Sequence, residues 1–435
     1  MASAQIVFLT LFLGLTSGLQ PVELHVEGPV QSVRILVGGH EAAKLDGPPW
    51  RARVDFGPLA PAELTAVAYD AAGTEIARAS QLLNLPRPTA EFEIGLERDG
   101  TAAVLHWHHL MGSKPRQATM SVDGSPLAVD SDWRATLPKL DPLMPHVLSA
   151  EMRFADGFVA RKEMVIQGLR SDSTGTELTP VMLWQKANEK AADPAGCFTA
   201  AGRAVHVSAI EKSPARIFLV QEPFPGKAID TYHVLWSERQ PGGIRDRDPL
   251  GRDTSARIQW PIARNFGGGG ADAGSSTLFP RSPDLPGNRG GMLWLLTRSF
   301  EDRTRIDDPR RFADAVAVAG LNATAGGFRR AVVLVLGDRR DTSHYDPRSV
   351  RQYLDSLGVP LFVWSLTGAR PDLAGSWGAV DDISTTGKLR EATRRLQQVL
   401  DSERVVWLAA DPITALHVQA DERCGVAMGA VQPTR

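Results

Sequence analysis

The stretch RRAVVLVLGDRRDTSHYDP, residues 329–347, decides the fold. Its apolar run, residues 331–336, leads into Asp338, and a second carboxylate, Asp341, follows with two hydroxyl residues. A strand that is apolar on both faces is typical of a parallel sheet covered by helices on both sides. Carboxylates and hydroxyls that directly follow such a strand are residue types that bind metal ions. The stretch therefore predicts a buried strand whose carboxyl end is a candidate metal site.

The region around this strand alternates between apolar runs and helical patterns. Further buried strands are predicted at 215–221, 256–262, 292–297, 360–366 and 404–410, and helices at 309–321, 346–358 and 387–402. In the last helix one face is formed by Leu389, Ala392, Leu396, Val399 and Leu400. Asp346 and Pro347 suit the N-cap and the first position of the helix before it. Together these patterns predict an α/β domain with a mostly parallel sheet over residues 214–411.

An internal repeat precedes this domain. Residues 33–80 and 118–166 each contain a strand, a glycine turn and the tripeptide Trp-Arg-Ala, which begins at Trp50 in the first copy and at Trp133 in the second. Each copy then has Leu-(Ser/Thr)-Ala, with a glycine nine residues after the leucine. Short alternating strands with Gly and Asp turns are typical of β-sandwiches of immunoglobulin type. We expect the two tryptophans to pack in the two cores.

The repeat and the change in pattern after it set the predicted domain boundaries. The two β-sandwich domains are expected at residues 21–86 and 87–170, followed by an extended linker at 171–213. The α/β domain occupies 214–411, and residues 412–435 are a C-terminal tail.

The first twenty residues, MASAQIVFLTLFLGLTSGLQ, have an apolar core too short to span a bilayer. Its length suits a signal peptide, and residues 16–18 are small, as at a cleavage site. Because MASAQ contains no Lys or Arg, the alternative is a buried first strand or a misplaced start. We predict a signal peptide over residues 1–20 and export to the periplasm or the exterior. No later segment has eighteen consecutive apolar residues, so no other membrane span is expected.

The charge and the cysteine content of the chain narrow the range of possible functions. The chain has 435 residues and a net charge of -2, and this charge balance gives no indication of binding to nucleic acid or to an anionic membrane. The chain has two cysteines, Cys197 and Cys424. Their spacing indicates neither a disulfide framework nor a zinc site, and whether they form a disulfide with each other stays open.

Motifs of the standard enzyme classes are incomplete. The glycine run at 267–270 lacks the dinucleotide-binding spacing, and the Gly-Lys in PFPGKAI, residues 223–229, lacks the rest of a phosphate loop. No G-x-S-x-G nucleophile elbow is present. We therefore expect no catalysis. The alternative is an enzyme with an unrecognised site near the Gly/Ser/Pro-rich loop 264–291.

Four stretches, FADAVAVAGL, RRAVVLVLGDRRDTS, GVPLFVWSL and KLREATRRLQQVLDSERVVWL, together resemble a von Willebrand factor A-type domain. The resemblance covers roughly residues 205–410 and is to bacterial exported proteins that place such a domain after β-sandwich segments. It implies a site for Mg²⁺ at the carboxyl edge of the sheet, where a carboxylate of the partner protein completes the coordination. The family's ligands are an Asp-x-Ser-x-Ser after the first strand, a Thr from a middle loop and an Asp after the fourth strand.

Only the last of these ligands is present. Residues 221–225 read QEPFP where Asp-x-Ser-x-Ser is expected, and residues 307–309 read DDP near the position of the Thr, with Thr304 the nearest hydroxyl. Asp338 matches the Asp after the fourth strand. Asp338 and Asp341 are therefore candidates for a remnant magnesium site, and the alternative is that Asp338 caps a helix or accepts from a loop N–H.

The expected fold is multidomain, with two all-β sandwich domains followed by an α/β, Rossmann-like A-type domain. The expected function is that of an exported, non-catalytic module that binds another protein in the cell envelope or outside, without a cofactor. A magnesium-dependent adhesion protein with a remnant site at Asp338 is the alternative from the same resemblance.

Overall fold

The computed structural model describes most of the chain outside several loops and both ends. The described residues are 4–12, 14–85, 90–97, 101–109, 114–141, 144, 146–155, 159–166, 178–185, 196–200, 202–222, 250–251, 253–262, 279, 282–287, 291–296, 309–410, 412–421, 424 and 426–428.

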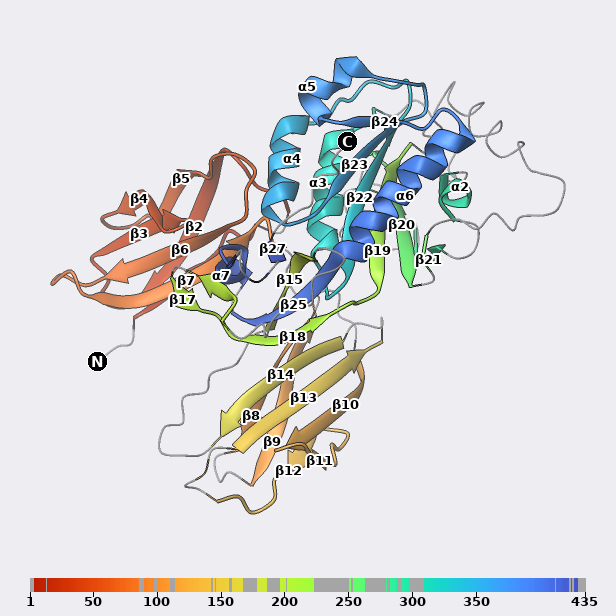
Figure 1. The fold of residues 1–435 in the computed structure, drawn as a ribbon. Helices are drawn as coiled ribbons and strands as arrows, with labels where there is room; N and C mark the ends of the chain where they lie inside the picture. Colours follow the sequence, from red (N-terminus) through yellow and green to blue (C-terminus); the bar gives the residue numbers. More distant parts are fainter. Residues whose placement is uncertain are drawn as a thin grey trace.

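The N-terminal part of the chain is a sandwich of two antiparallel sheets (Figure 1). One sheet has the strand order β1-β2-β5 and the other β4-β3-β6-β7. The strands are β1 (Gln5–Phe8), β2 (Leu19–Glu27), β3 (Ser32–Val37), β4 (His40–Leu45), β5 (Arg51–Asp55), β6 (Ala62–Tyr69) and β7 (Glu75–Leu83). Alternating apolar residues of both sheets fill the space between them, as the period-2 pattern predicts.

The strand β1 lies within the predicted signal peptide. It pairs antiparallel with β2, and Ile6 and Phe8 point into the core with 5% and 7% exposure. Val7, between them, is 41% exposed. The described part of residues 1–20 is therefore built into the first sandwich, which begins near residue 5 and not at residue 21. The segment thus forms the buried first strand that was the alternative to a signal peptide. Export remains a prediction.

The second sandwich repeats the strand order of the first. Its sheets are β12-β9-β8 and β11-β10-β13-β14. The strands are β8 (Ala90–Leu96), β9 (Ala102–His109), β10 (Pro115–Val122), β11 (Ser125–Leu127), β12 (Arg134–Thr136), β13 (His146–Phe154) and β14 (Val159–Ile166). Trp50 and Trp133 pack, half-buried, against the two cores, and the repeated Leu64 and Leu148 are fully buried. The prediction of two β-sandwiches from the repeat is confirmed.

The predicted linker, residues 171–213, is wrong in its described part. It contributes strands to a four-stranded antiparallel sheet with the order β18-β25-β15-β27, and to a small sheet with the order β17-β16-β26. The strands are β15 (Leu178–Gln185), β16 (Phe198–Ala200), β17 (Arg203–Ala204), β18 (Val207–Glu211), β25 (Glu403–Ala409), β26 (Gln419–Ala420) and β27 (Val426–Met428). The physical reason is that the backbone groups of an apolar segment such as VMLW need a partner strand, which β25 supplies.

The C-terminal tail is also part of this unit. Residues 412–435 include the helix α7 (Pro412–Leu416) as well as β26 and β27. Cys197 and Cys424 form a disulfide, with their Cα atoms 6.1 Å apart, beside a small core that includes Phe198 and Leu408. The pairing that the sequence left open is thus formed, and it links residues 227 positions apart.

The α/β domain contains a six-stranded sheet with the order β21-β20-β19-β22-β23-β24. All neighbouring strands are parallel except β20 and β21. The strands are β19 (Ala215–Gln221), β20 (Thr254–Gln259), β21 (Leu285–Pro286), β22 (Arg329–Leu336), β23 (Leu361–Ser365) and β24 (Val380–Asp382). The predicted strand 404–410 forms β25 of the antiparallel sheet instead, so the parallel sheet ends before residue 403.

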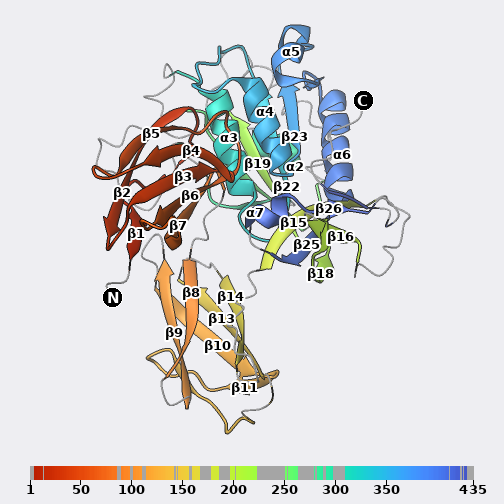
Figure 2. The same ribbon diagram turned by 90° about the vertical axis from the view of Figure 1, so that its left-hand side faces the viewer.

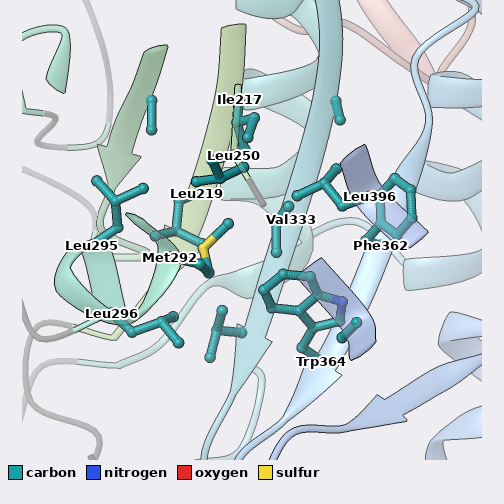
Figure 3. Close-up of a cluster of buried hydrophobic side chains, with 14 of the residues drawn as sticks. Ile217, Leu219, Leu250, Met292, Leu295, Leu296, Val333, Phe362, Trp364 and Leu396 are labelled. Carbon is teal, nitrogen blue, oxygen red and sulfur yellow. The ribbon is translucent and has the colours of Figure 1, made fainter. Parts of the chain in front are cut away.

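Helices cover both faces of this sheet. On one face lie α2 (Gly291–Leu296) and α6 (Thr386–Ser402). The predicted apolar face of α6 packs on the strands around Trp364 (Figure 3). On the other lie α3 (Phe312–Ala323) and α4 (Pro347–Ser356). A short 3₁₀ turn (Pro371–Leu373) and α5 (Ala374–Trp377) precede β24. The predicted strand at 292–297 is wrong, because a six-residue apolar run fits a buried helix equally well.

The first sandwich packs against the α3/α4 face (Figure 2). Leu59 and Leu85 of the sandwich join the apolar cluster of these helices. The hydroxyl of Tyr353 in α4 donates a 2.7 Å hydrogen bond to the backbone oxygen of Asn84. The Asn84 side chain in turn bonds to both backbone groups of Thr16. The N-terminal segment is therefore part of the contact between the two domains.

No helix in the described part of the chain is both long and apolar enough to cross a membrane.

The role of β1 can be tested with two adjacent substitutions. Ile6→Ala removes a buried side chain, so we expect the free energy of unfolding of the full chain to fall by about 2–5 kcal/mol. Val7→Ala changes an exposed side chain and should cost less than about 0.5 kcal/mol. Denaturant unfolding, with the N-terminus of each purified chain verified by mass spectrometry, makes the comparison. Equal effects of the two substitutions would contradict the place of β1 in the core.

Candidate functional site

The candidate site lies at the carboxyl edge of the parallel sheet, where β19 and β22 end side by side. The residue after β19 is Glu222, and Gly337 and Asp338 follow β22. In an open parallel sheet, ligands bind outside the carboxyl ends of the strands, where the strand order reverses. In the order β21-β20-β19-β22-β23-β24, this reversal falls between β19 and β22. Glu222 and Asp338 therefore stand where such a sheet offers a site.

Of the two predicted site residues, Asp341 is used to cap a helix. Helix α3 has Arg311 at its N-cap, and that side chain makes no capping bond. Asp341 supplies the missing cap, since its carboxylate accepts from the backbone N–H groups of Phe312, at 2.9 Å, and Ala313, at 3.2 Å. It also accepts from the N–H and the hydroxyl of Ser343, at 3.0 and 2.6 Å. A carboxylate at a helix N-terminus is well placed with respect to the helix dipole.

The buried Asp314 holds the other end of the same loop. Its carboxylate accepts from the backbone N–H groups of His344, at 3.1 Å, and Tyr345, at 3.0 Å, and pairs with Arg311. Asp314 comes from the first turn of α3, so both ends of the loop that follows Asp338 are fixed to that helix. The next helix, α4, begins as predicted, with Asp346 as N-cap and Pro347 in its first turn.

Glu222 forms a buried ion pair with Arg310. The Nε of Arg310 donates to Oε2 of Glu222 at 3.3 Å, and the two side chains are 2% and 1% exposed. Within the described chain, Oε1 of Glu222 has no hydrogen-bond partner. Burial raises the pKa of Glu222 to about 7, against the lowering effect of Arg310, and the negative charge of Asp338 raises it further. Asp338 itself is exposed.

The described residues of this edge do not fit a magnesium ion. The oxygens of Asp341 are occupied by four hydrogen bonds, and the guanidinium of Arg310 places a fixed positive charge beside Glu222. Mg²⁺ needs several oxygen ligands in near-octahedral geometry, and Asp338 alone supplies one carboxylate. Among the described residues, no three His, Cys, Asp or Glu side chains are placed to hold a metal ion.

Several residues considered from the sequence lie outside the described part. These are Pro223, Phe224, Pro225, Thr304, Asp307, Asp308 and, apart from residues 279, 282–287 and 291, the loop 264–291.

Sequence reasoning missed Arg310 and Asp314. Arg310 falls within the predicted helix 309–321, and nothing in the sequence around it indicated a role at the site. The burial of Arg310 against Glu222 is not visible in the sequence, because an arginine in a Pro-Arg-Arg stretch is usually exposed.

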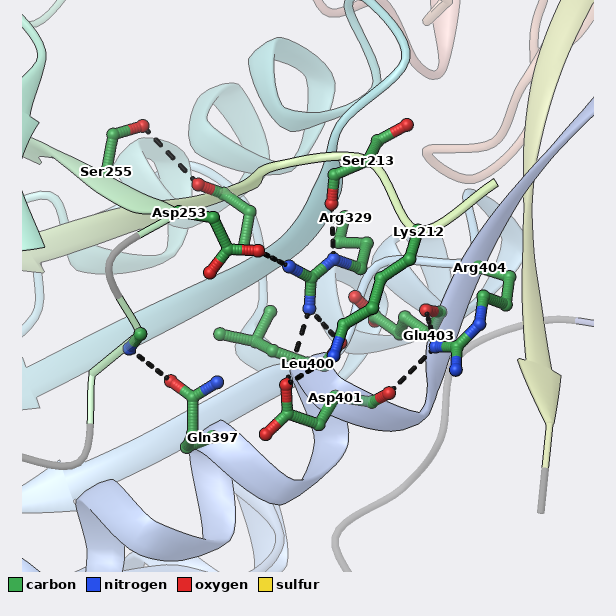
Figure 4. A network of polar contacts seen from close by, with 12 residues as sticks. Lys212, Ser213, Asp253, Ser255, Arg329, Gln397, Leu400, Asp401, Glu403 and Arg404 are labelled. Atoms are coloured by element: carbon green, nitrogen blue, oxygen red, sulfur yellow. Dashed lines mark hydrogen bonds and ion pairs between the residues drawn. The ribbon is translucent and has the colours of Figure 1, made fainter. Parts of the chain in front are cut away.

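A second polar cluster lies at the opposite, amino edge of the sheet (Figure 4). Arg329, the first residue of β22, is fully buried and donates to the backbone oxygens of Ser213 and Leu400 and to the carboxylate of Asp253. Leu400 is in the last turn of α6, whose carbonyl groups need donors. Glu403 accepts from the backbone N–H of Arg330, and burial raises the pKa of Glu403 to about 8. The hydrogen bonds of Arg329 and the bond from the Arg330 N–H to Glu403 tie α6 and the antiparallel sheet to β22.

Removing the cap of α3 should destabilise the fold. We expect Asp341→Ala to lower the free energy of unfolding by about 1–2 kcal/mol, since two helix N–H groups lose their acceptor. Asp338→Ala, in an exposed residue of the same loop, should change it by less than about 0.5 kcal/mol. Thermal and denaturant unfolding measure both, and a larger effect at Asp338 than at Asp341 would contradict these roles.

The pKa of Glu222 predicts a pH dependence of stability. Between its ordinary pKa of 4.5 and about 7, the folded chain holds a proton on Glu222 that the unfolded chain releases. This group's contribution to stability is therefore full below pH 4.5 and is lost as the pH rises through 7, by up to about 3 kcal/mol. Denaturant unfolding at pH 5 and pH 8 should show a smaller decrease for Glu222→Gln than for the wild type. An identical decrease in the two chains would contradict a raised pKa.

No protein-family model matches the chain, and no curated protein matches it. Among solved structures, the fibronectin(III)-like modules of Clostridium thermocellum CbhA match at 14% identity over 38% of this chain and 94% of theirs, with a TM-score of 0.16. A β-glycosidase from Bacteroides vulgatus matches at 10% identity over 38% of this chain and 25% of its own, with a TM-score of 0.24. Bacteroides ovatus SGBP-B, solved with a mixed-linkage heptasaccharide, matches at 10% identity over 46% of this chain and 78% of its own, with a TM-score of 0.14. Since TM-scores this low do not define a common fold, the domains are assigned from the strand order and contacts of the chain itself.

Proposed function

We propose that this chain is a non-catalytic module that binds another protein, and that its α/β domain is a Rossmann-like von Willebrand factor A-type domain that has lost its metal site. The strand order supports this assignment, with β19 and β22 in the centre and the carboxyl edge open at the reversal between them. The family binds its partners at this edge. Function inferred from a fold is analogy, so the proposal depends on the residues at the edge itself.

The observation that carries the proposal is the buried pair of Glu222 and Arg310. Glu222 lies at the end of β19, where the family has the first of its metal ligands. Arg310 lies two residues before α3, near the place of the family's Thr. A guanidinium there neutralises the carboxylate of Glu222 without a metal ion. With Asp341 engaged as a helix cap, the edge keeps the position of an A-type site but uses its polar residues for the fold.

Export is part of the proposal, and the disulfide supports it. Disulfides such as Cys197–Cys424 form and persist in oxidising compartments, which include the periplasm and the exterior of the cell. The two β-sandwiches in series suit a protein whose surfaces are used for docking in the cell envelope.

Affinity capture tests the proposed function. The full chain, immobilised in its oxidised form, is exposed to native envelope extract and to extracellular fluid, with EDTA and without it. We expect a protein that is retained equally in both arms, is displaced by excess free chain, and forms a complex with the purified chain in size-exclusion chromatography.

Three results would contradict the proposal. Loss of the partner in EDTA would restore the magnesium-dependent adhesion protein, and heat released on titration of the chain with Mg²⁺ or Mn²⁺ would point the same way. Failure of the free chain to displace any retained protein would remove the binding function.

A further inference from the structure

Two histidines alternate along one strand of the second sandwich. Strand β9 reads AAVLHWHH, and its His106 and His108 are two residues apart. Because successive residues of a strand belong to opposite faces of the sheet, these two histidines share one face. Ala103 and Leu105, which alternate with them, are 0% and 2% exposed in the core of the sandwich. The two histidines therefore stand on the outer face of the sheet, and His106 is exposed.

The neighbouring strand β8 places two glutamates opposite these histidines (Figure 2). The antiparallel register pairs Glu93 with His106 and Glu91 with His108. Ile94, the residue after Glu93, is buried in the core, so both glutamates share the outer face with the histidines. Directly opposite residues have Cβ atoms about 5 Å apart, and alternate residues of one strand are about 7 Å apart. The four residues thus stand at the corners of one small area of the sheet.

The structure describes the backbone of all four residues and, among their side chains, that of His106. The ring of His106 lies over Gly95, where an added Cβ atom would be 3.1 Å from Nε2. The missing side chain at Gly95 gives the ring room beside the backbone. Since an exposed side chain changes rotamer within nanoseconds, this ring can turn toward Glu93, the residue opposite it.

An arginine on the same face is paired with a carboxylate of its own. Arg134 of β12 stands opposite Val104. Its guanidinium donates to both carboxylate oxygens of Glu97, from Nε at 2.7 Å and from Nη2 at 2.9 Å. Such a bidentate pair neutralises the guanidinium, which reduces its repulsion of a cation bound farther along β9.

Two imidazoles and two carboxylates are a ligand set that suits zinc. Zn²⁺ binds His nitrogens and Glu oxygens, most often four ligands in tetrahedral geometry. Two carboxylates balance the charge of the ion, and the imidazoles bind in their neutral form. Mg²⁺ and Ca²⁺ take oxygen ligands instead, so the histidines favour a transition metal over both.

We infer that Glu91, Glu93, His106 and His108 form a zinc site on the outer face of the second sandwich, and that the ion links β8 to β9. In the sheet β12-β9-β8 the strand β8 stands at the edge, next to β9. An ion with ligands from both strands holds this edge strand in place and stabilises the folded chain. The inference is independent of the proposed function, because this face lies in a different domain from the carboxyl edge of the parallel sheet.

The test is calorimetric titration of the full oxidised chain with ZnCl₂, after metal ions and chelator have been removed. At about pH 7.5, above the ordinary pKa of histidine, we expect one ion per chain at this site. His106→Gln/His108→Gln should weaken zinc binding by at least about tenfold, and so should Glu91→Gln/Glu93→Gln.

The matched control is His40→Gln/His417→Gln, which removes two exposed histidines elsewhere in the chain. It should change the affinity for zinc by less than about twofold, because neither residue belongs to the inferred site. Unfolding curves recorded without zinc verify that all three variants are folded.

Three results would overturn the inference. Absence of zinc binding to the wild-type chain would remove the site. Equal weakening in the two histidine variants would mean that zinc binds to surface histidines in general. Unchanged affinity in the Glu91→Gln/Glu93→Gln variant would leave β8 without a ligand and so remove the link between the two strands.

Discussion

The burial of β22 along its whole length is the constraint on which the rest of the structure depends. All eight residues of this strand are buried, so both faces of the parallel sheet must be covered. Helices α2 and α6 cover one face, and α3 and α4 cover the other. The second cover is completed by Leu59 and Leu85 of the first sandwich. The first sandwich is therefore part of the packing of the α/β domain and not a separate spacer.

The same central strand explains where the buried charges lie. Near each of its ends lies a buried arginine whose guanidinium group binds acceptors of the chain. At the amino edge Arg329 binds backbone oxygens and Asp253, and at the carboxyl edge Arg310 binds Glu222. An arginine keeps its charge when buried, whereas the charge of Glu222 depends on pH because its pKa is raised to about 7.

Local sequence patterns predicted helices and strands well. They did not predict which strands pair when the two are far apart in the sequence. The apolar run of β22, the Asp-Pro start of α4 and the apolar face of α6 each depend on neighbouring residues, and they were predicted correctly. The partner of β15 lies more than two hundred residues away, so its strand looked like a linker. At the candidate site the position of Asp338 followed from β22. The roles of Asp341 and Arg310 depend on how α3 packs against the loop after β22. A local sequence pattern does not contain that information.

The disulfide between Cys197 and Cys424 makes the chain between them a covalent ring that encloses the whole parallel sheet. A protease that cuts once within this ring, for example in the Gly/Ser/Pro-rich stretch 264–291, opens it without separating any fragment. The nicked protein would run as one band on a non-reducing gel and as two after reduction. A cleaved molecule would thus keep its sandwiches attached to both parts of the α/β domain, and limited proteolysis would not by itself separate them.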